Sequence, residues 1–372
     1  MKTVSLLLAT LLSTVALTRA AEALPERLSD EAFWKFIEDS SEASQVFPGE
    51  NFVSNEPRYA AVVRALNQNV PQGGVFLGVG PEQNFTYISA IRPKLAFIVD
   101  IRRQNMDEQL IYKALFEISE DRAEFLSRLF SRKRPDGLNE NSTARALMNA
   151  YDAATAESPA YVENLAIIRR TLVAKHGFRL TEEDNAAIER IFKVFAASGT
   201  QINYQSPGVG SRGAAFNMPS YAALMTAVDI DGRNWSYLAT EESYRFVRDM
   251  QRKNLIIPVV GDFAGPKAIR AIGRYLKNYD TTVSVFYLSN VETYLFAGSG
   301  PGAPTQAARA LAPNGGWRAF FENVATLPLD SASTFIRFQP GAAAEGQLGS
   351  IQETLEGVKS GAIRTLADLI AK

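Results

Sequence analysis

Two short apolar runs, residues 75–79 and 95–101, constrain the fold of this 372-residue chain more strongly than any other feature. Nearly unbroken apolar character is typical of strands that are buried on both faces of a parallel sheet. The first run ends in a glycine turn at Gly80, a short helix is expected to begin near Pro81, and the second run ends at Asp100. The segment therefore predicts a strand–helix–strand crossover, and with it an α/β fold.

Three further apolar runs extend the predicted sheet, at residues 255–260, 283–288 and 334–338. A long block with apolar residues at helical spacing separates them from the first two runs. Because this block is longer than one crossover helix, we interpret residues 107–198 as a helical insertion that covers the carboxyl edge of the sheet. The predicted fold class is an α/β, Rossmann-like domain with a largely parallel sheet and a large helical insertion.

The chain is expected to divide into four regions. A signal peptide covers residues 1–20, and a helical lead-in covers residues 21–74. The Rossmann-like domain then covers residues 75–340, and a helical tail covers residues 341–372.

The first of these regions carries the pattern of an export signal. Lys2 precedes an apolar run over residues 4–17, and small residues follow at Ala20 and Ala23, where a signal peptidase could cleave. The run is shorter than the ~20 apolar residues that a membrane span requires. We therefore expect a periplasmic or secreted protein with no membrane span in the mature chain. An uncleaved N-terminal anchor is the alternative.

The composition excludes several classes of protein. Because the chain contains no cysteine, disulfides, thiol enzymes and a lipoprotein anchor are excluded. Its one histidine, His176, precedes Gly177 in a pattern typical of a helix C-terminus, so we expect no triad hydrolase, no zinc enzyme and no metal. The net charge of −1 and the absence of a Lys/Arg run argue against nucleic-acid binding. The expected partner is a small molecule, and the sequence indicates no oligomeric state.

The glycine turn points to a nucleoside. Gly80 and Asp100 are 20 residues apart, the spacing at which a carboxylate at the tip of the second strand reaches the ribose of a nucleoside lying over the turn. Gln83 replaces the third glycine of the dinucleotide fingerprint, Pro81 removes a backbone N–H, and Glu82 adds a negative charge where a pyrophosphate would bind. A ligand with a ribose and a cationic centre but no phosphate fits these residues, and S-adenosylmethionine is such a ligand. The alternative is a plain strand-to-helix turn.

The segment from Gly73 to Arg103 resembles the first glycine motif and the acidic second strand of class I S-adenosylmethionine-dependent methyltransferases. Over residues 50–338 the chain also resembles a bacterial family of methyltransferase-like, often exported proteins, a family that brings no established reaction. The segments that carry this likeness are residues 51–56 (NFVSNE), 78–103, 254–273 (NLIIPVVGDFAGPKAIRAIG) and 286–296 (FYLSNVETYLF).

The resemblance implies a sheet of the class I methyltransferase type and cofactor contacts at Gly78, Gly80 and Asp100, but it implies no catalytic residue. An aromatic-proline tetrapeptide is usual after the fourth strand of such enzymes. Residues 261–264 (GDFA) stand there instead, which departs from the enzymes that methylate amide or base nitrogens.

Other polar residues follow the predicted strands, where ligands of open parallel sheets bind. Glu82 and Asp262 are further candidates for binding the cofactor, and the candidates for binding a substrate are Asn55, Glu56, Arg102 and Asn290. Their alternative role is capping, since Asp262 and Asn290 each precede a helical stretch.

Two functions are compatible with these features. The chain could be an exported methyltransferase-like protein that binds S-adenosylmethionine or a related nucleoside, with an unknown methyl acceptor. Alternatively, it could be a non-catalytic exported binding or interaction module that keeps the Rossmann-like fold. The second is considered because S-adenosylmethionine is made in the cytoplasm.

Overall fold

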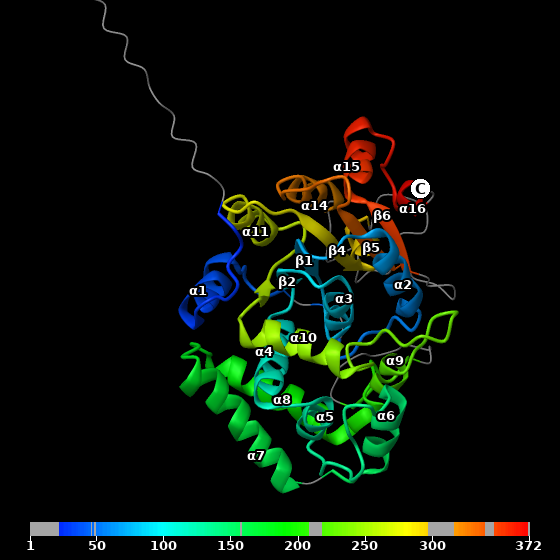
Figure 1. Ribbon diagram of the computed structural model, residues 1–372. Helices are drawn as coiled ribbons and strands as arrows, with labels where there is room; N and C mark the ends of the chain where they lie inside the picture. The colour runs from blue at the N-terminus through cyan, green and yellow to red at the C-terminus, as the bar shows by residue number, and fades with distance from the viewer. Residues whose placement is uncertain are drawn as a thin grey trace, which may run out of the picture.

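The computed structural model describes residues 22–45, 47, 50–156, 158–207, 218–296, 316–338 and 346–370. The expected signal peptide, residues 1–20, lies outside the described residues. Figure 1 shows an α/β fold in which a twisted sheet lies between helices. None of the described helices combines the length and the apolarity that a membrane crossing requires.

The described strands form one six-stranded sheet in the order β3-β2-β1-β4-β5-β6. Their bounds are β1 Val75–Gly78, β2 Leu95–Asp100, β3 Ile256–Val260, β4 Val283–Ser289, β5 Thr334–Phe338 and β6 Gly346–Ser350. Strands β1 to β5 run parallel, and β6 runs antiparallel to β5. The five predicted strands are thus confirmed in a largely parallel sheet.

Burial explains why these runs could be found in the sequence. Every residue of β1, β2 and β3 is buried, so each position favours an apolar side chain, and Asp100 is the one carboxylate that ends such a run. The register places Asp100 opposite Val260, and Gly78 opposite Ile98. The carboxyl ends of the central strands therefore meet at one edge of the sheet.

Helices cover both faces of this sheet. On one face α2 (Tyr59–Asn69), α3 (Gln83–Ile91), α10 (Glu241–Arg252) and α4 (Arg103–Ile118) pack in a row. On the other face lie α1 (Asp30–Ser40), α11 (Ala268–Leu276), α14 (Trp317–Val324) and α15 (Ile351–Ser360). This double covering explains the buried strands.

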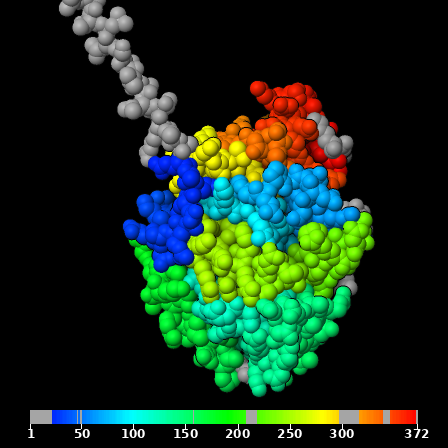
Figure 2. All heavy atoms as spheres, in the orientation of Figure 1, coloured from blue at the N-terminus to red at the C-terminus, as the bar shows by residue number. Residues whose placement is uncertain are grey.

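The helical insertion forms a third layer beyond α4 and α10. Its remaining α-helices are α5 (Arg122–Leu129), α6 (Ala144–Ala153), α7 (Ser158–Arg169) and α8 (Glu182–Ser198), and the short helix α9 (Tyr221–Met225) packs against α6. Helix α8 begins with a capping box at Thr181, whose side chain accepts from the Asp184 N–H while the Asp184 carboxylate accepts from the Thr181 N–H. Figure 2 shows the insertion, in green, directly below α10, in yellow-green, on a continuous surface.

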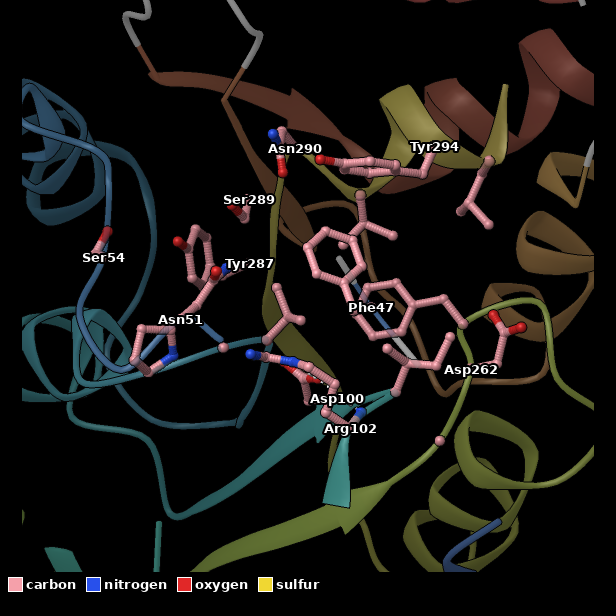
Figure 3. Close-up of a pocket in the computed structure, with 18 of the residues that line it drawn as sticks. Phe47, Asn51, Ser54, Asp100, Arg102, Asp262, Tyr287, Ser289, Asn290 and Tyr294 are labelled. Atoms are coloured by element: carbon pink, nitrogen blue, oxygen red, sulfur yellow. Dashed lines mark hydrogen bonds and ion pairs between the residues drawn. The ribbon is translucent and has the colours of Figure 1, made fainter. Parts of the chain in front are cut away.

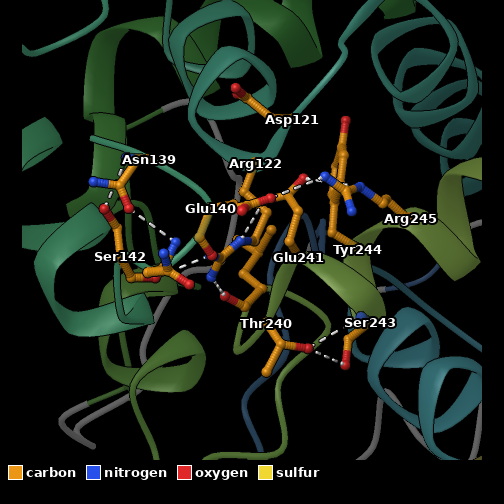
Figure 4. Close-up of polar contacts among 12 residues, drawn as sticks. Asp121, Arg122, Asn139, Glu140, Ser142, Thr240, Glu241, Ser243, Tyr244 and Arg245 are labelled. Atoms are coloured by element: carbon orange, nitrogen blue, oxygen red, sulfur yellow. Dashed lines mark hydrogen bonds and ion pairs between the residues drawn. The ribbon is translucent and has the colours of Figure 1, made fainter. Parts of the chain in front are cut away.

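Arg122 connects the insertion to the helices of the sheet (Figure 4). Its guanidinium donates to Glu241 at 2.9 Å and to four backbone carbonyl groups, those of Leu238, Ala239, Glu140 and Ser142, at 2.8–3.1 Å. These five hydrogen bonds use every N–H of the side chain. Arg122 is therefore a saturated structural residue.

The C-terminal region differs in part from the helical tail that was expected. Strand β6 at residues 346–350 precedes the helices α15 and α16 (Leu366–Ile370). The strand is only partly buried and contains Gly346 and Gly349, so it lacks the apolar run by which the other strands are recognised. Its pairing with β5 supplies hydrogen bonds to the strand that would otherwise form the edge of the sheet.

Candidate functional site

A pocket opens at the carboxyl ends of β1, β2, β3 and β4 (Figure 3). It spans about 890 Å³ with its open mouth included. Strand β1 lies between β2 and β4, so the pocket occupies the point at which the strand order of the sheet reverses, where ligands of such folds bind. The residues that line it are Phe47, Asn51, Ser54, Asn55, Val79, Gly80, Pro81, Asp100, Ile101, Arg102, Gly261, Asp262, Phe263, Tyr287, Ser289, Asn290, Val291, Tyr294 and Leu295.

The glycine turn forms part of the pocket floor. Gly80 has φ +77°, a conformation that glycine adopts readily, and a Cβ built on it meets no atom within 4 Å. The Asn84 amide holds the turn by donating to the carbonyls of Val79 at 3.0 Å, Gly80 at 3.2 Å and Pro81 at 2.7 Å. The backbone at Gly80 is therefore fixed and open to a ligand.

Gly78, the other glycine predicted to contact the cofactor, lies outside the residues that line the pocket. A Cβ at this position would lie 1.9 Å from Asn84 Oδ1 and 2.7 Å from the ring of Phe76. Glycine is needed there because β1 packs closely against the start of α3. In the structure Gly78 therefore has a packing role.

Asp100 lies at the centre of the pocket, but its carboxylate is already paired. Its Oδ1 accepts from the backbone N–H of Arg102 at 2.9 Å and from Arg102 Nε at 3.0 Å, and its Oδ2 accepts from Arg102 Nη2 at 3.0 Å. Burial opposes ionisation of Arg102, yet the carboxylate outweighs it and raises the pKa of the guanidinium. Three of the roughly four acceptor positions of a carboxylate are thus used. Both predicted residues line the pocket, as one ion pair.

Glu82 lies beneath the pocket and does not line it. The side chain is fully buried, and its two carboxylate oxygens accept from the backbone N–H of Ser54 at 3.2 and 3.3 Å. Burial raises its pKa to about 8, and the neighbouring Glu56 adds to the rise. Glu82 is therefore mostly neutral at pH 7. The expected negative charge at the phosphate position is absent, because the side chain points inward and holds the segment at Ser54.

Glu56 also lies behind the pocket wall, and it reaches the pocket through two hydroxyl groups. Tyr287 Oη donates to its Oε2 at 2.8 Å, and Ser289 Oγ donates to its Oε1 at 2.6 Å. Burial raises the pKa of Glu56 to about 7, although both hydrogen bonds oppose the rise. Asn55 and Asn290, its predicted companions, line the pocket directly.

Asp262 lines the opposite side of the pocket (Figure 3). Its Oδ1 accepts from the backbone N–H of Ala264 at 2.9 Å, and its Oδ2 contacts Gln45 Nε2 at 3.5 Å. Burial raises its pKa. The side chain therefore both shapes the turn after β3 and faces the pocket.

Sequence reasoning missed the aromatic walls of the pocket. Phe47 and Tyr294 meet edge to face, with ring centroids 5.2 Å apart, and Phe47 lies 5.9 Å from the Arg102 guanidinium. Tyr287 could have been found by its place at the carboxyl end of a predicted strand. Phe47 could not, because it lies in an irregular connection that only the fold brings over the sheet.

The helical insertion does not cover this pocket as was expected. Among the described residues of 107–198, none lines it. The helices of this block that follow α4 pack against one another and against α4. Phe47, Asn51, Ser54 and Asn55 line the pocket instead.

No group of three or more His, Asp or Glu side chains that could hold a metal ion occurs in the described part of the chain. Comparison with family models matches residues 51–347 to a family described as a domain of unknown function, DUF7790, and the chain belongs to this family. Comparison with curated proteins gave no match.

Proposed function

We propose that this member of the DUF7790 family is an exported methyltransferase-like protein that binds S-adenosylmethionine, or a related nucleoside, in the pocket between β1, β2 and β4. One observation carries the proposal. The pocket at the reversal of strand order contains both the open glycine turn at Gly80 and Asp100 at the tip of the second strand. This is the arrangement by which doubly wound folds hold the ribose of a nucleoside.

The sheet supports a fold of the class I methyltransferase type. The order β3-β2-β1-β4-β5 is that of doubly wound nucleotide-binding domains. Strand β6 adds one antiparallel strand next to the fifth parallel strand.

The turn at the start of α3 favours a ligand without phosphates. Pro81 has no N–H to offer, and the Asn84 amide binds the carbonyls of the turn. The turn thus offers a phosphate one backbone donor fewer, whereas a pyrophosphate site needs several N–H groups that point at the ligand.

The polar and aromatic residues of the pocket match the parts of an S-adenosyl ligand. Asp100 would accept from a ribose hydroxyl through its remaining acceptor position, and Arg102 beside it would attract the carboxylate of the ligand. Phe47 and Tyr294 offer aromatic surfaces to the base or to the sulfonium cation. The bound ligand would supply an electrophilic methyl group, and this chain would bind and orient it.

The Asp100–Arg102 pair favours the second candidate function in one respect. A ribose diol usually uses two acceptor positions of a free carboxylate, and only about one remains on Asp100. If the Asp100 carboxylate stays paired with Arg102 and accepts no ribose hydroxyl, the protein is an exported binding module whose pocket holds another small molecule.

Calorimetric titration of the mature chain with S-adenosylhomocysteine tests the proposal, with NAD⁺ as the phosphate-bearing control. Saturable binding of S-adenosylhomocysteine and no binding of NAD⁺ is the expected result. Absence of binding, or a preference for NAD⁺, would leave the binding-module alternative.

Export is part of the proposal and has its own test. Cleavage is expected after Ala20 or Ala23, because small residues there follow an apolar run. N-terminal sequencing of the protein from the cell envelope or the medium checks this. An intact Met1 on a cytoplasmic product would contradict export and would place the protein where S-adenosylmethionine is made.

A further inference from the structure

Ser289 is held in an unusual backbone conformation at the pocket wall. It ends β4 with φ +51°, in the left-handed region that residues with a Cβ rarely adopt. Such a conformation is strained and persists where the surrounding structure imposes it, often at functional sites. The strained residue lines the pocket and directs its hydroxyl to Glu56.

Glu56 has no cationic partner among the described residues. Among the other buried glutamates, Glu241 and Glu292 form ion pairs, with Arg122 at 2.9 Å and with Arg337 at 2.8 Å. Glu82, in contrast, resembles Glu56 in having no cationic partner among the described residues. Within the described part of the chain, the Glu56 carboxyl group is bonded only to the two hydroxyls of Tyr287 and Ser289, and the residue is 4% exposed. A buried carboxyl group without a counter-charge does not help the fold, because burial disfavours its charged form.

The two residues together form a path for a proton. The Ser289 hydroxyl donates to Glu56, and its lone pairs remain able to accept a hydrogen bond from a ligand in the pocket. Tyr287 orients the other oxygen of the carboxyl group. A nucleophile or relay group bonded to a base that a third group orients is the arrangement on which proton transfer depends.

We propose that Glu56, through the hydroxyl of Ser289, is the proton acceptor for a small aromatic hydroxyl compound, which is the methyl acceptor of this pocket. The inference rests on the proposed function, since it names the acceptor class for the same site. The aromatic rings of Phe47, Tyr287 and Tyr294, together with apolar side chains, line the pocket and match an uncharged ring.

The step is balanced. The acceptor O–H gives its proton to Ser289 Oγ as Ser289 gives its own proton to Glu56, and the acceptor oxygen takes the methyl group from the sulfonium. The positive charge of the sulfonium and the negative charge of Glu56 both disappear. The products are a methyl ether, S-adenosylhomocysteine and a protonated Glu56, which then loses its proton to water.

The acidity of Glu56 fits this role. Its pKa of about 7 makes it a base that is half ionised near neutral pH, as general catalysis requires. The titratable groups that face it are Glu82, Tyr87 and Tyr287. Burial raises the pKa of both tyrosines well above its usual range, so neither titrates near pH 7.

The test uses 4-methylphenol, which stays neutral from pH 5 to 9, so that any pH dependence of its binding comes from the protein. Its hydroxyl binds best when Ser289 is polarised by an ionised Glu56. We expect binding to the mature wild-type chain to tighten about tenfold between pH 6 and 8, with a midpoint near 7. The profile should be flat in Glu56→Gln and in Ser289→Ala.

A control is Ser89→Ala, since Ser89 is a buried serine whose hydroxyl bonds the Thr86 carbonyl, outside the residues that line the pocket. It should keep the wild-type profile. A flat profile in the wild type, or a midpoint that persists in Glu56→Gln and Ser289→Ala, would overturn the proposal. Titration of the wild type with S-adenosylhomocysteine reports separately on the proposed function, so the two can fail independently.

Discussion

Two buried arginines, Arg122 and Arg102, have opposite surroundings. Both pair with a carboxylate, but Arg122 places all five of its N–H groups on protein acceptors, whereas Arg102 places two on Asp100 and lines a pocket. The cluster around Arg122 can gain nothing from a ligand, because every donor is used. The pocket near Arg102 and Glu56 contains a buried ion pair, the strained residue Ser289 and space for a ligand. The difference separates a cluster that holds the fold from one that is available to bind.

The largest expected effect is on stability at Arg122. Arg122→Met leaves the Glu241 carboxylate and four carbonyls without their donor, and removing one partner of a buried pair costs about 3–5 kcal/mol. Urea unfolding followed by circular dichroism measures the loss. Arg128→Met is the matched control, since its pair with Glu124 is about a quarter exposed and such a pair contributes at most ~1 kcal/mol.

Arg102→Met completes the comparison. The loss should be smaller than at Arg122, about 1.5–3 kcal/mol, because water in the pocket can solvate the Asp100 carboxylate that remains. An equal loss at both positions would contradict the distinction between the two clusters.

Asp100→Asn should affect both binding and stability. Affinity for S-adenosylhomocysteine is expected to fall at least tenfold, about 1.4 kcal/mol, because the amide keeps the shape but loses the charge and one acceptor oxygen. The stability of the unliganded protein should also fall, by about 1.5–3 kcal/mol, because Asp100 forms an ion pair with Arg102.

Calorimetry and thermal melts on wild type and Asp100→Asn, run in parallel, separate the two effects. If Asp100→Asn is less stable and the wild type binds no S-adenosylhomocysteine, Asp100 serves only as the ion-pair partner of Arg102.

The sheet could be predicted from the sequence because burial on both faces leaves an apolar run at every central strand. The ends of those runs also marked the pocket, and Asn55, Gly80, Asp100, Arg102, Asp262 and Asn290 all line it. What a sequence does not show is where a side chain turns at the end of a strand. Glu82 points into the interior to meet Ser54, and Asp100 meets a residue two positions away. Both outcomes depend on three-dimensional packing.

Stability should fall as the pH rises from 5 to 8. Burial raises the pKa of Glu82 and Asp107 to about 8 and that of Glu56 to about 7, each above its ordinary value near 4. The folded state therefore binds these protons more tightly than the unfolded state. The associated stability is present below the ordinary pKa and is lost as the pH passes through the raised values.

Glu82→Gln removes one of these groups. The free energy of unfolding should then fall less steeply with pH, by about 1.4 kcal/mol per pH unit between pH 5 and 8. Urea unfolding at several pH values measures the slope. An unchanged slope would mean that Glu82 does not titrate as its burial implies.

The smallest expected difference distinguishes the two glycines of the turn. Gly78→Ala should cost about 1–3 kcal/mol of stability, because the new Cβ collides with Asn84 and Phe76. Gly80→Ala should cost about 1 kcal/mol for its positive φ, and it should weaken binding of S-adenosylhomocysteine because the methyl group enters the pocket. Melts and titrations of both variants check this, and weaker binding in Gly78→Ala alone would reverse the assignment.

A crystal structure of the mature chain with S-adenosylhomocysteine tests the central claim most directly. The account predicts the ligand in the pocket at the carboxyl ends of β1, β2 and β4, with the adenosyl group over Gly80 and a ribose hydroxyl within hydrogen-bond distance of the Asp100 carboxylate. Ligand bound elsewhere on the chain, or an empty pocket at saturating concentration with the Asp100–Arg102 pair unchanged, would contradict it.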